Sequence, residues 1–428
     1  MLVNLSWLWF DRIIRMVVGL FVVAWMARSL GATDFGRLNF GLALVGIFSI
    51  FSRLGLDGIL VRELVRYPDR KGTLLGSAFL LRCLGGLVLI VTTGFFSMLL
   101  RPEDTVLFWL VILLSFGHLA RSLDVVELWL RSLVLAKYSV IPQLVGVLLA
   151  SLARILVLVA GGSLVLLGAT YFFEGVLVAG GLLWVYRRMN GQDGWSVTQR
   201  DSVALLGESW PLIFSGLFSM LYQQVDQLMI GQMLGNYALG QYSAVVKISV
   251  VWYFLPVSVV HSVQKFIVEA KDQSASLYEA RMQDVFTVLF ALSLLICIPF
   301  VMFPAEILHL IYGKQYIESS GVLIVHILSN IIIFVGMARS LWATTEGYVK
   351  FIMYANVSAS FVNIFLNYYL LPIYGIVGAA YSTLISYAFA YVFSNAIYNK
   401  SRPLFFMQLK TLCFLDFSRV IKKYGLIR

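Results

Sequence analysis

The chain has 428 residues, of which 60% are hydrophobic and only 13% are charged. Soluble domains carry about 25% charged residues, so this composition excludes a soluble globular protein and predicts an all-α integral membrane protein. The net charge of +10 would suit a nucleic-acid-binding protein, but the positions of the basic residues argue against that interpretation.

Twelve apolar runs follow one another along the chain, and each is long enough to cross a hydrocarbon core of about 30 Å as a helix. The connections between these runs are short, and none could hold a folded soluble domain. The predicted spans are 5–30, 37–61, 74–100, 105–129, 138–160, 163–186, 205–231, 240–265, 284–303, 321–345, 350–371 and 376–398.

Basic residues are distributed unevenly among the connections. Gaps after even-numbered spans hold most of them, whereas the other gaps hold little more than Arg101 and Lys314. Because cytoplasmic loops carry an excess of Lys and Arg, we predict that both termini are cytoplasmic. The basic residues after even-numbered spans are Arg62, Arg66, Arg70, Lys71, Arg131, Lys137, Arg187, Arg188, Arg200, Lys271 and Arg281.

Two short segments resemble each other and suggest a duplication. LGATDFG (30–36) and LGNYALG (234–240) begin 204 residues apart, and each follows the first predicted span of its half. Duplicated bundles around a shared site are common in transporters. We therefore predict two pseudo-symmetric six-helix bundles, 1–190 and 205–400, around a central cavity. The polar linker 191–204 separates them, and a basic cytoplasmic tail, 401–428, follows.

Some basic residues inside spans have no Asp or Glu three or four residues away, among them Arg82, Arg154, Lys247 and Arg339. Leaving a charge in hydrocarbon costs at least about 2.5 kcal/mol. One interpretation is pairing between helices, with Glu174, Glu208 or Asp226 as partners. The other is a positively charged cavity for an anionic substrate, since Arg binds phosphate bidentately and Lys acts as a point charge.

Other charged residues inside spans do have a neighbour one helical turn away, and local neutralisation is one interpretation of them. These pairs are Asp11 with Arg15, Arg53 with Asp57, and Arg121 with Asp124. Arg15 and Arg53 are also candidates for the cavity. Membrane-embedded carboxylates can hold a proton or Na⁺, so Asp57, Glu174 and Asp226 are candidates for ion coupling. No nucleotide, zinc or nucleophile motif is present, and we expect no catalytic residue, metal or cofactor.

Several motifs together resemble a known family. They are LGATDFGRL (30–38), RLGLD (53–57), VRE (61–63), VDQLMIG (225–231), and the second repeat continuing into GQY (240–242). The chain resembles the polysaccharide biosynthesis flippases, the Wzx-type O-antigen transporters of the multidrug/oligosaccharidyl-lipid/polysaccharide exporter superfamily. This resemblance implies a flippase of the bacterial inner membrane. It would move undecaprenyl-diphosphate-linked oligosaccharide from the cytoplasmic to the periplasmic leaflet by alternating access. Its possible partners are H⁺ or Na⁺ and a polysaccharide polymerase with its chain-length machinery.

Three alternatives stay open. A multidrug antiporter of the same superfamily would favour an acidic cavity, and a peptidoglycan-precursor flippase would usually have fourteen spans. A membrane glycosyltransferase or polymerase would need catalytic groups in a substantial outer loop, and the longest outer gap, 304–320, offers few.

Overall fold

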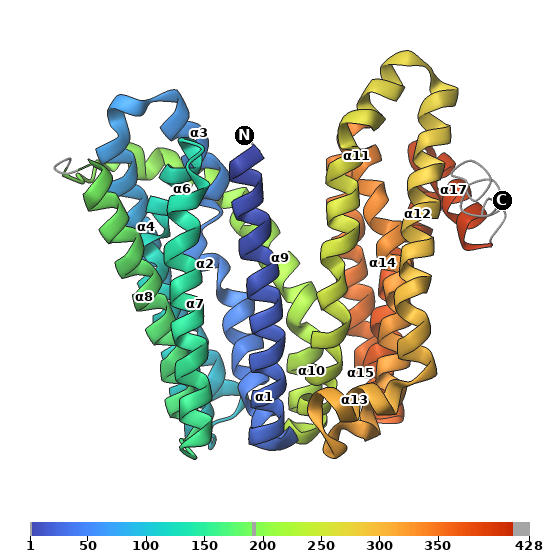
Figure 1. The fold of residues 1–428 in the computed structure, drawn as a ribbon, viewed down its shortest axis with the longest axis horizontal. Coiled ribbons are helices and arrows are strands. Elements are labelled where there is room, and N and C mark those ends of the chain that lie inside the picture. Colours follow the sequence, from blue (N-terminus) through green and yellow to red (C-terminus); the bar gives the residue numbers. More distant parts are fainter. Residues whose placement is uncertain (1, 191–193, 414–428) are drawn as a thin grey trace. The chain divides into compact units, whose positions relative to one another are not determined.

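The structure, a computed structural model, describes residues 2–190 and 194–413, and these residues form helices with short connections and no strand (Figure 1). A bilayer favours this architecture because a helix satisfies its own backbone hydrogen bonds. The principal helices of the first part are α1 (Leu2–Phe48), α2 (Ile50–Arg53), α3 (Leu56–Arg66), α4 (Lys71–Leu100), α5 (Thr105–Ala120), α6 (Val125–Ser132), α7 (Ala136–Val159), α8 (Leu164–Asn190) and α9 (Gln199–Met233). They are followed by α10 (Gly235–Val250), α11 (Phe254–Gln273), α12 (Ala275–Met302), α13 (Pro304–Tyr312), α14 (Ser320–Glu346), α15 (Val349–Ala388), α16 (Ser394–Ile397) and α17 (Arg402–Leu412).

The described residues contain ten continuous helical stretches that are long and apolar enough to cross a membrane. Two of these stretches contain a break at a glycine with a positive φ, Gly31 in α1 (φ 72°) and Gly375 in α15 (φ 58°). Because side chains disfavour that region of backbone space, glycine permits the chain to turn there. Counting each broken stretch as two gives twelve, the predicted number of spans, and the predicted fold class is confirmed. The second span, predicted as 37–61, instead ends at Phe48.

The repeat detected in the sequence corresponds to a shared backbone feature. Gly31 and Gly235 occupy the same position of the two copies, and both have a positive φ, 72° and 88°. Each lies where one long helix gives way to the next. The helix resumes directly after Gly31, so the predicted gap at 31–36 is a kink rather than a loop.

The described chain divides into two compact units, Met1–Gln232 and Met233–Arg428. In the first unit, the connections α3–α4, α6–α7 and α8–α9 lie at the end that holds the N-terminus (Figure 1), in agreement with the predicted alternation of gaps. α9 contacts this unit along its length: Asp201 pairs with Arg70 near its start, and the Gly231 carbonyl accepts from Arg101 near its end. The sequence repeat instead assigns α9 to the second half. The predicted boundary between the halves at 191–204 therefore stays a prediction. Residues 191–193 of that boundary lie outside the described residues.

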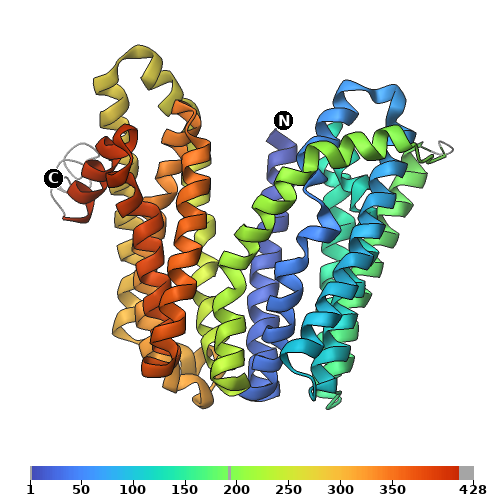
Figure 2. The ribbon, with the colours of Figure 1, turned by 180° about the vertical axis from the view of Figure 1, so that it is seen from behind.

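The second unit has an apolar core made by α11, α12 and α14, with residues such as Phe286, Phe334 and Leu341 fully buried. Figure 2 shows α17 lying beside the other helices of this unit. Gln283 of α12 donates a hydrogen bond to Thr411 of α17 (2.8 Å). The first part of the predicted tail is therefore a docked helix, and residues 414–428 lie outside the described residues.

Candidate functional site

The site in the first unit begins with a break between α2 and α3. Leu54 and Gly55 both adopt left-handed backbone conformations, with φ 54° and 64°. A Cβ on Gly55 would lie 2.7 Å from the Leu212 Cβ of α9, so close packing also requires glycine here. The break separates Arg53 from Asp57 and interrupts the helical turn that would have joined them.

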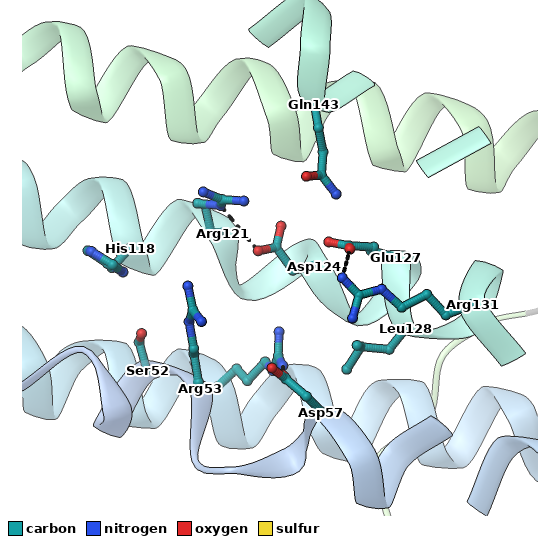
Figure 3. Close-up of a pocket in the computed structure, with 11 residues that line it drawn as sticks. Ser52, Arg53, Asp57, His118, Arg121, Asp124, Glu127, Leu128, Arg131 and Gln143 are labelled. Carbon is teal, nitrogen blue, oxygen red and sulfur yellow. Dashed lines mark hydrogen bonds and ion pairs between the residues drawn. The ribbon is translucent and has the colours of Figure 1, made fainter. Parts of the chain in front are cut away.

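Around this break lies a polar pocket of about 160 Å³ (Figure 3). Water occupies about 30 Å³ per molecule in the liquid, so the pocket has room for several waters, but it is smaller than the roughly 300 Å³ of a small ligand site. Arg53 and Gln143 point toward its middle from opposite sides (Figure 3). Its lining residues are Ser52, Arg53, Asp57, Arg82, His118, Arg121, Asp124, Glu127, Leu128, Arg131 and Gln143.

The charges in this pocket are almost balanced. Four arginines face three carboxylates, which leaves one arginine in excess. Three arginines have a carboxylate partner: Arg82 with Asp57, Arg131 with Glu127, and Arg121 with Asp124 at 3.1 Å.

Arg53 is the remaining arginine of the pocket. It is exposed, and within the described parts of the chain no carboxylate lies within 4.0 Å of its guanidinium group. The excess positive charge of the pocket is therefore on Arg53.

The local pairing of Arg53 with Asp57, one interpretation of their spacing, is wrong. Four residues separate them by one turn only in a continuous helix, and the left-handed residues Leu54 and Gly55 interrupt that helix. Asp57 bonds instead to Arg82 of α4. Pairing between helices thus accounts for Arg82, whereas local pairing is confirmed for Arg121 with Asp124 and for Arg15 with Asp11 (2.6 Å).

Arg15 lies beside this pocket. Its guanidinium donates a hydrogen bond to the Gln143 side-chain oxygen at 2.7 Å, and Gln143 lines the pocket. Arg15 thus connects α1 to the polar cluster through one side chain. The structure therefore brings together four predicted residues, Arg15, Arg53, Asp57 and Arg82.

Arg154 and Glu174 form a separate ion pair between α7 and α8, with 2.5 Å between the guanidinium nitrogen and the carboxylate oxygen. The Arg154 guanidinium also lies over the Tyr171 ring, 3.9 Å from its centroid. The interhelical pairing that was one interpretation of Arg154 is confirmed.

The other predicted site residues lie elsewhere. Arg339 is only 1% exposed in the second unit, where it donates hydrogen bonds to the Ala390 carbonyl and to the Ser394 hydroxyl (3.0 Å). These acceptors belong to the π-helical turn Phe389–Phe393 and to α16. Lys247 is half-buried on α10, and Asp226 is half-buried on α9 and has an interaction partner.

Most residues of one wall of the pocket were not among the predicted site residues. Five residues of this wall follow one another at intervals of three or four residues: His118, Arg121, Asp124, Glu127 and Arg131. This spacing places them on one face of the continuous stretch Thr105–Ser132. This polar stripe on an apolar span can be recognised in the sequence, although the spacing of Arg121 and Asp124 alone indicates only a local pair. Gln143 carried no signal, because a single Gln in a span usually bridges helices.

The Arg82–Asp57 pair predicts an asymmetric response to mutation. The Arg82 side chain is 4% exposed and that of Asp57 is 50% exposed. Asp57→Ala leaves a buried guanidinium without its carboxylate and is expected to cost about 3 kcal/mol. Arg82→Leu leaves a carboxylate that water can solvate and is expected to cost about 1 kcal/mol. Melting temperatures of the two purified variants check the order, which the reverse result would contradict.

Comparison with known families gives two matches. The model of the family described as "Polysaccharide biosynthesis protein" matches residues 1–264, which is more than half of the chain. The MatE family model matches residues 211–369. No curated protein matches the sequence.

Solved structures with the same fold cover nearly the whole chain. "Lipid II flippase MurJ, inward closed conformation" has a TM-score of 0.68 and 15% identity, covering 97% of this chain and 92% of that one. An inward-facing "multidrug resistance MATE family transporter of the MOP superfamily" has a TM-score of 0.70 and 12% identity, covering 91% and 95%. The MATE multidrug transporter DinF-BH has a TM-score of 0.60 and 17% identity, covering 92% and 95%. At these identities the likeness establishes the fold.

Proposed function

We infer a function from the premise that this chain belongs to the polysaccharide biosynthesis protein family and is a multi-pass membrane protein with the fold of the MOP superfamily transporters. We propose that it is a flippase for undecaprenyl-diphosphate-linked oligosaccharide, such as an O-antigen repeat unit. The substrate would pass from the cytoplasmic to the periplasmic leaflet by alternating access. The family match supports the polysaccharide, and the fold, shared with a lipid II flippase, supports a lipid-linked substrate.

One observation carries this proposal: Arg53, which belongs to the predicted span 37–61, lines a polar pocket and has no carboxylate partner among the described residues. A cation that faces a polar pocket and has no counter-ion from the protein is available to an anionic ligand. A diphosphate offers oxygens that match the planar donors of a guanidinium. The pocket is too small for the sugars, so we assign to it only a contact with the phosphates.

The neighbouring Arg82–Asp57 pair suggests how an ion could be coupled to transport. A phosphate bound near Arg53 competes with Asp57 for the Arg82 guanidinium. Asp57 released from Arg82 would be available to a coupling ion, because membrane-embedded carboxylates can hold H⁺ or Na⁺. Asp57 is thus our first candidate for coupling to H⁺ or Na⁺, and Glu174 and Asp226 remain further candidates.

We assign the other predicted substrate contacts different weights. Arg15, held by Asp11 and Gln143, extends the phosphate site toward α1. Lys247 is proposed as a separate contact in the second unit. We propose that Arg154 contacts the substrate while it is paired with Glu174. Arg339, buried against the π-helical turn, is proposed to maintain that turn rather than to touch substrate.

Reconstitution tests the proposed function. Purified protein in vesicles of defined lipid composition should accelerate the leaflet exchange of undecaprenyl-diphosphate oligosaccharide, measured with and without a proton or sodium gradient. Exchange no faster than in protein-free vesicles, under every gradient, would refute it. Formation or cleavage of glycosidic bonds by the same preparation would instead establish an enzyme.

The Arg154–Glu174 pair gives a test of its own. If the pair only joins α7 and α8, replacing both residues by apolar ones of similar size (Arg154→Met with Glu174→Leu) should restore the stability lost in either single variant, because such replacements are often neutral. If Arg154 also contacts the substrate, the double variant should be stable but defective in transport. We expect the second result, measured by melting temperature and leaflet exchange together.

A multidrug antiporter is the second candidate. The MatE match over residues 211–369 favours it, as do the three carboxylates in the pocket of the first unit. A deletion strain that became sensitive to organic cations while keeping its surface polysaccharide would support this function.

For the location we propose the bacterial inner membrane, with both termini in the cytoplasm. The basic connections at one end of the first unit support this orientation. The polysaccharide polymerase and its chain-length machinery are the partners that a flippase of this kind would supply with substrate.

A further inference from the structure

A second cavity of the first unit lies between α7 and α8, and its walls are mainly apolar. It has a volume of about 700 Å³, which is within the range of roughly 300–1,000 Å³ for small-molecule sites. Tyr138, Ile141 and Val145 line it from α7, and Gly181, Trp184 and Arg188 line it from α8. Each set follows helical spacing, so each forms one face of its helix. None of these six residues belongs to the polar pocket.

The shape of this groove depends on a glycine. A Cβ on Gly181 would lie 2.8 Å from the Cβ of Pro142, so α7 and α8 approach closely at this level. Beside the contact, Ile141, Val145 and Trp184 are exposed. The groove is therefore an indentation on an exposed face of two apolar helices, and in a bilayer acyl chains would be the solvent that surrounds such a face.

One end of the groove is positively charged. Arg188 lines it and lies over the Trp184 ring, 5.2 Å from the centroid. In the described parts of the chain no carboxylate lies within 4.0 Å of the Arg188 guanidinium. Arg188 is in the last turn of α8, directly after Arg187. Trp and Tyr favour the headgroup level of a bilayer, so Trp184 and Tyr138 place this end at the headgroups.

We propose that the groove between α7 and α8 is a binding site for an anionic phospholipid. One acyl chain would lie against Ile141 and Val145, and the phosphate would accept hydrogen bonds from Arg188. Charge complementarity favours this occupant over a neutral lipid, because basic pockets between spans recognise anionic headgroups. The site would act independently of the substrate contacts proposed above.

Native mass spectrometry of the purified full chain tests this site, with phosphatidylglycerol as the probe and phosphatidylcholine as the neutral comparison. Arg188→Gln should weaken retention of phosphatidylglycerol about five-fold, as expected for loss of one basic residue near the surface, and leave phosphatidylcholine unchanged. Arg187→Gln is the matched control, because Arg187 is exposed on the same turn but does not line the groove. Its effect should be at least three-fold smaller.

Filling the groove provides a second, independent test. Val145→Trp should displace the lipid, whereas Leu149→Trp, at an exposed position one turn further along α7, should not. Equal effects of the two arginine variants, or unchanged lipid retention in Val145→Trp, would overturn the proposal. Competition by undecaprenyl phosphate would also overturn it, because the groove would then be a site for the substrate tail. A change in oligomeric state without lipid loss would overturn it as well, because the groove would then be an interface between copies of the chain.

Discussion

Replacing Arg53 by glutamine is expected to reduce leaflet exchange of the lipid-linked substrate by roughly 10- to 100-fold, because a hydrogen bond to a charged group contributes about 1.5–3 kcal/mol. The guanidinium has no carboxylate partner among the described residues, so its loss leaves no buried charge behind, and the protein should fold normally. Arg53→Lys keeps the charge without the bidentate geometry and should have an intermediate effect. The measurement is initial exchange rate in reconstituted vesicles at equal protein content.

Arg62→Gln is the control for the Arg53 variants. Arg62 is exposed on α3, where it pairs with Glu63 (3.0 Å) and Glu208, and it does not line the pocket. Exposed pairs contribute little, so transport should change by less than two-fold. Normal exchange in Arg53→Gln, or an equal loss in both variants, would remove Arg53 from the substrate site.

Gly55→Ala is expected to destabilise the protein by about 2–5 kcal/mol. An alanine in the left-handed region costs about 1–2 kcal/mol, and Gly55 has a φ of 64°. Its new Cβ would also lie 2.7 Å from the Leu212 Cβ, and overpacking of this kind costs about 1–3 kcal/mol more. The measurement is the melting temperature in detergent, followed by size-exclusion chromatography after heating.

Gly58→Ala, three residues further along, is the matched control for this variant. It lies within α3, and a Cβ there meets nothing within 4 Å. Alanine is more favourable than glycine inside a helix by roughly 0.5–1 kcal/mol, so this variant should be unchanged or slightly more stable. If both variants melt alike, the break at Leu54 and Gly55 does not determine the local packing.

Much of the fold could be predicted from the sequence because the bilayer imposes it. Apolar runs of about 20 residues must be helices, and the short connections fix their order. The alternation of basic connections also agrees with the end of the first unit at which α3–α4, α6–α7 and α8–α9 are joined. The repeat around Gly31 and Gly235 marked two positions that share a positive φ.

The partners of the charged residues could be predicted only in part. Arg15 with Asp11 and Arg121 with Asp124 are local pairs in continuous helices, and spacing identified both. Arg53 and Asp57 have the same spacing, but a two-residue break places Asp57 beside Arg82 instead. Spacing alone cannot detect such a break when one of the two left-handed residues is a leucine.

The sequence by itself therefore determined the class of the protein, its spans and the types of side chain that could meet an anionic substrate. Only the tertiary structure decided which arginines are neutralised: Arg82 by Asp57 and Arg154 by Glu174, with Arg53 left without a carboxylate partner among the described residues. The physical reason is that span formation depends on local hydrophobicity, whereas the partner of a charge depends on which helices pack together and on their rotation.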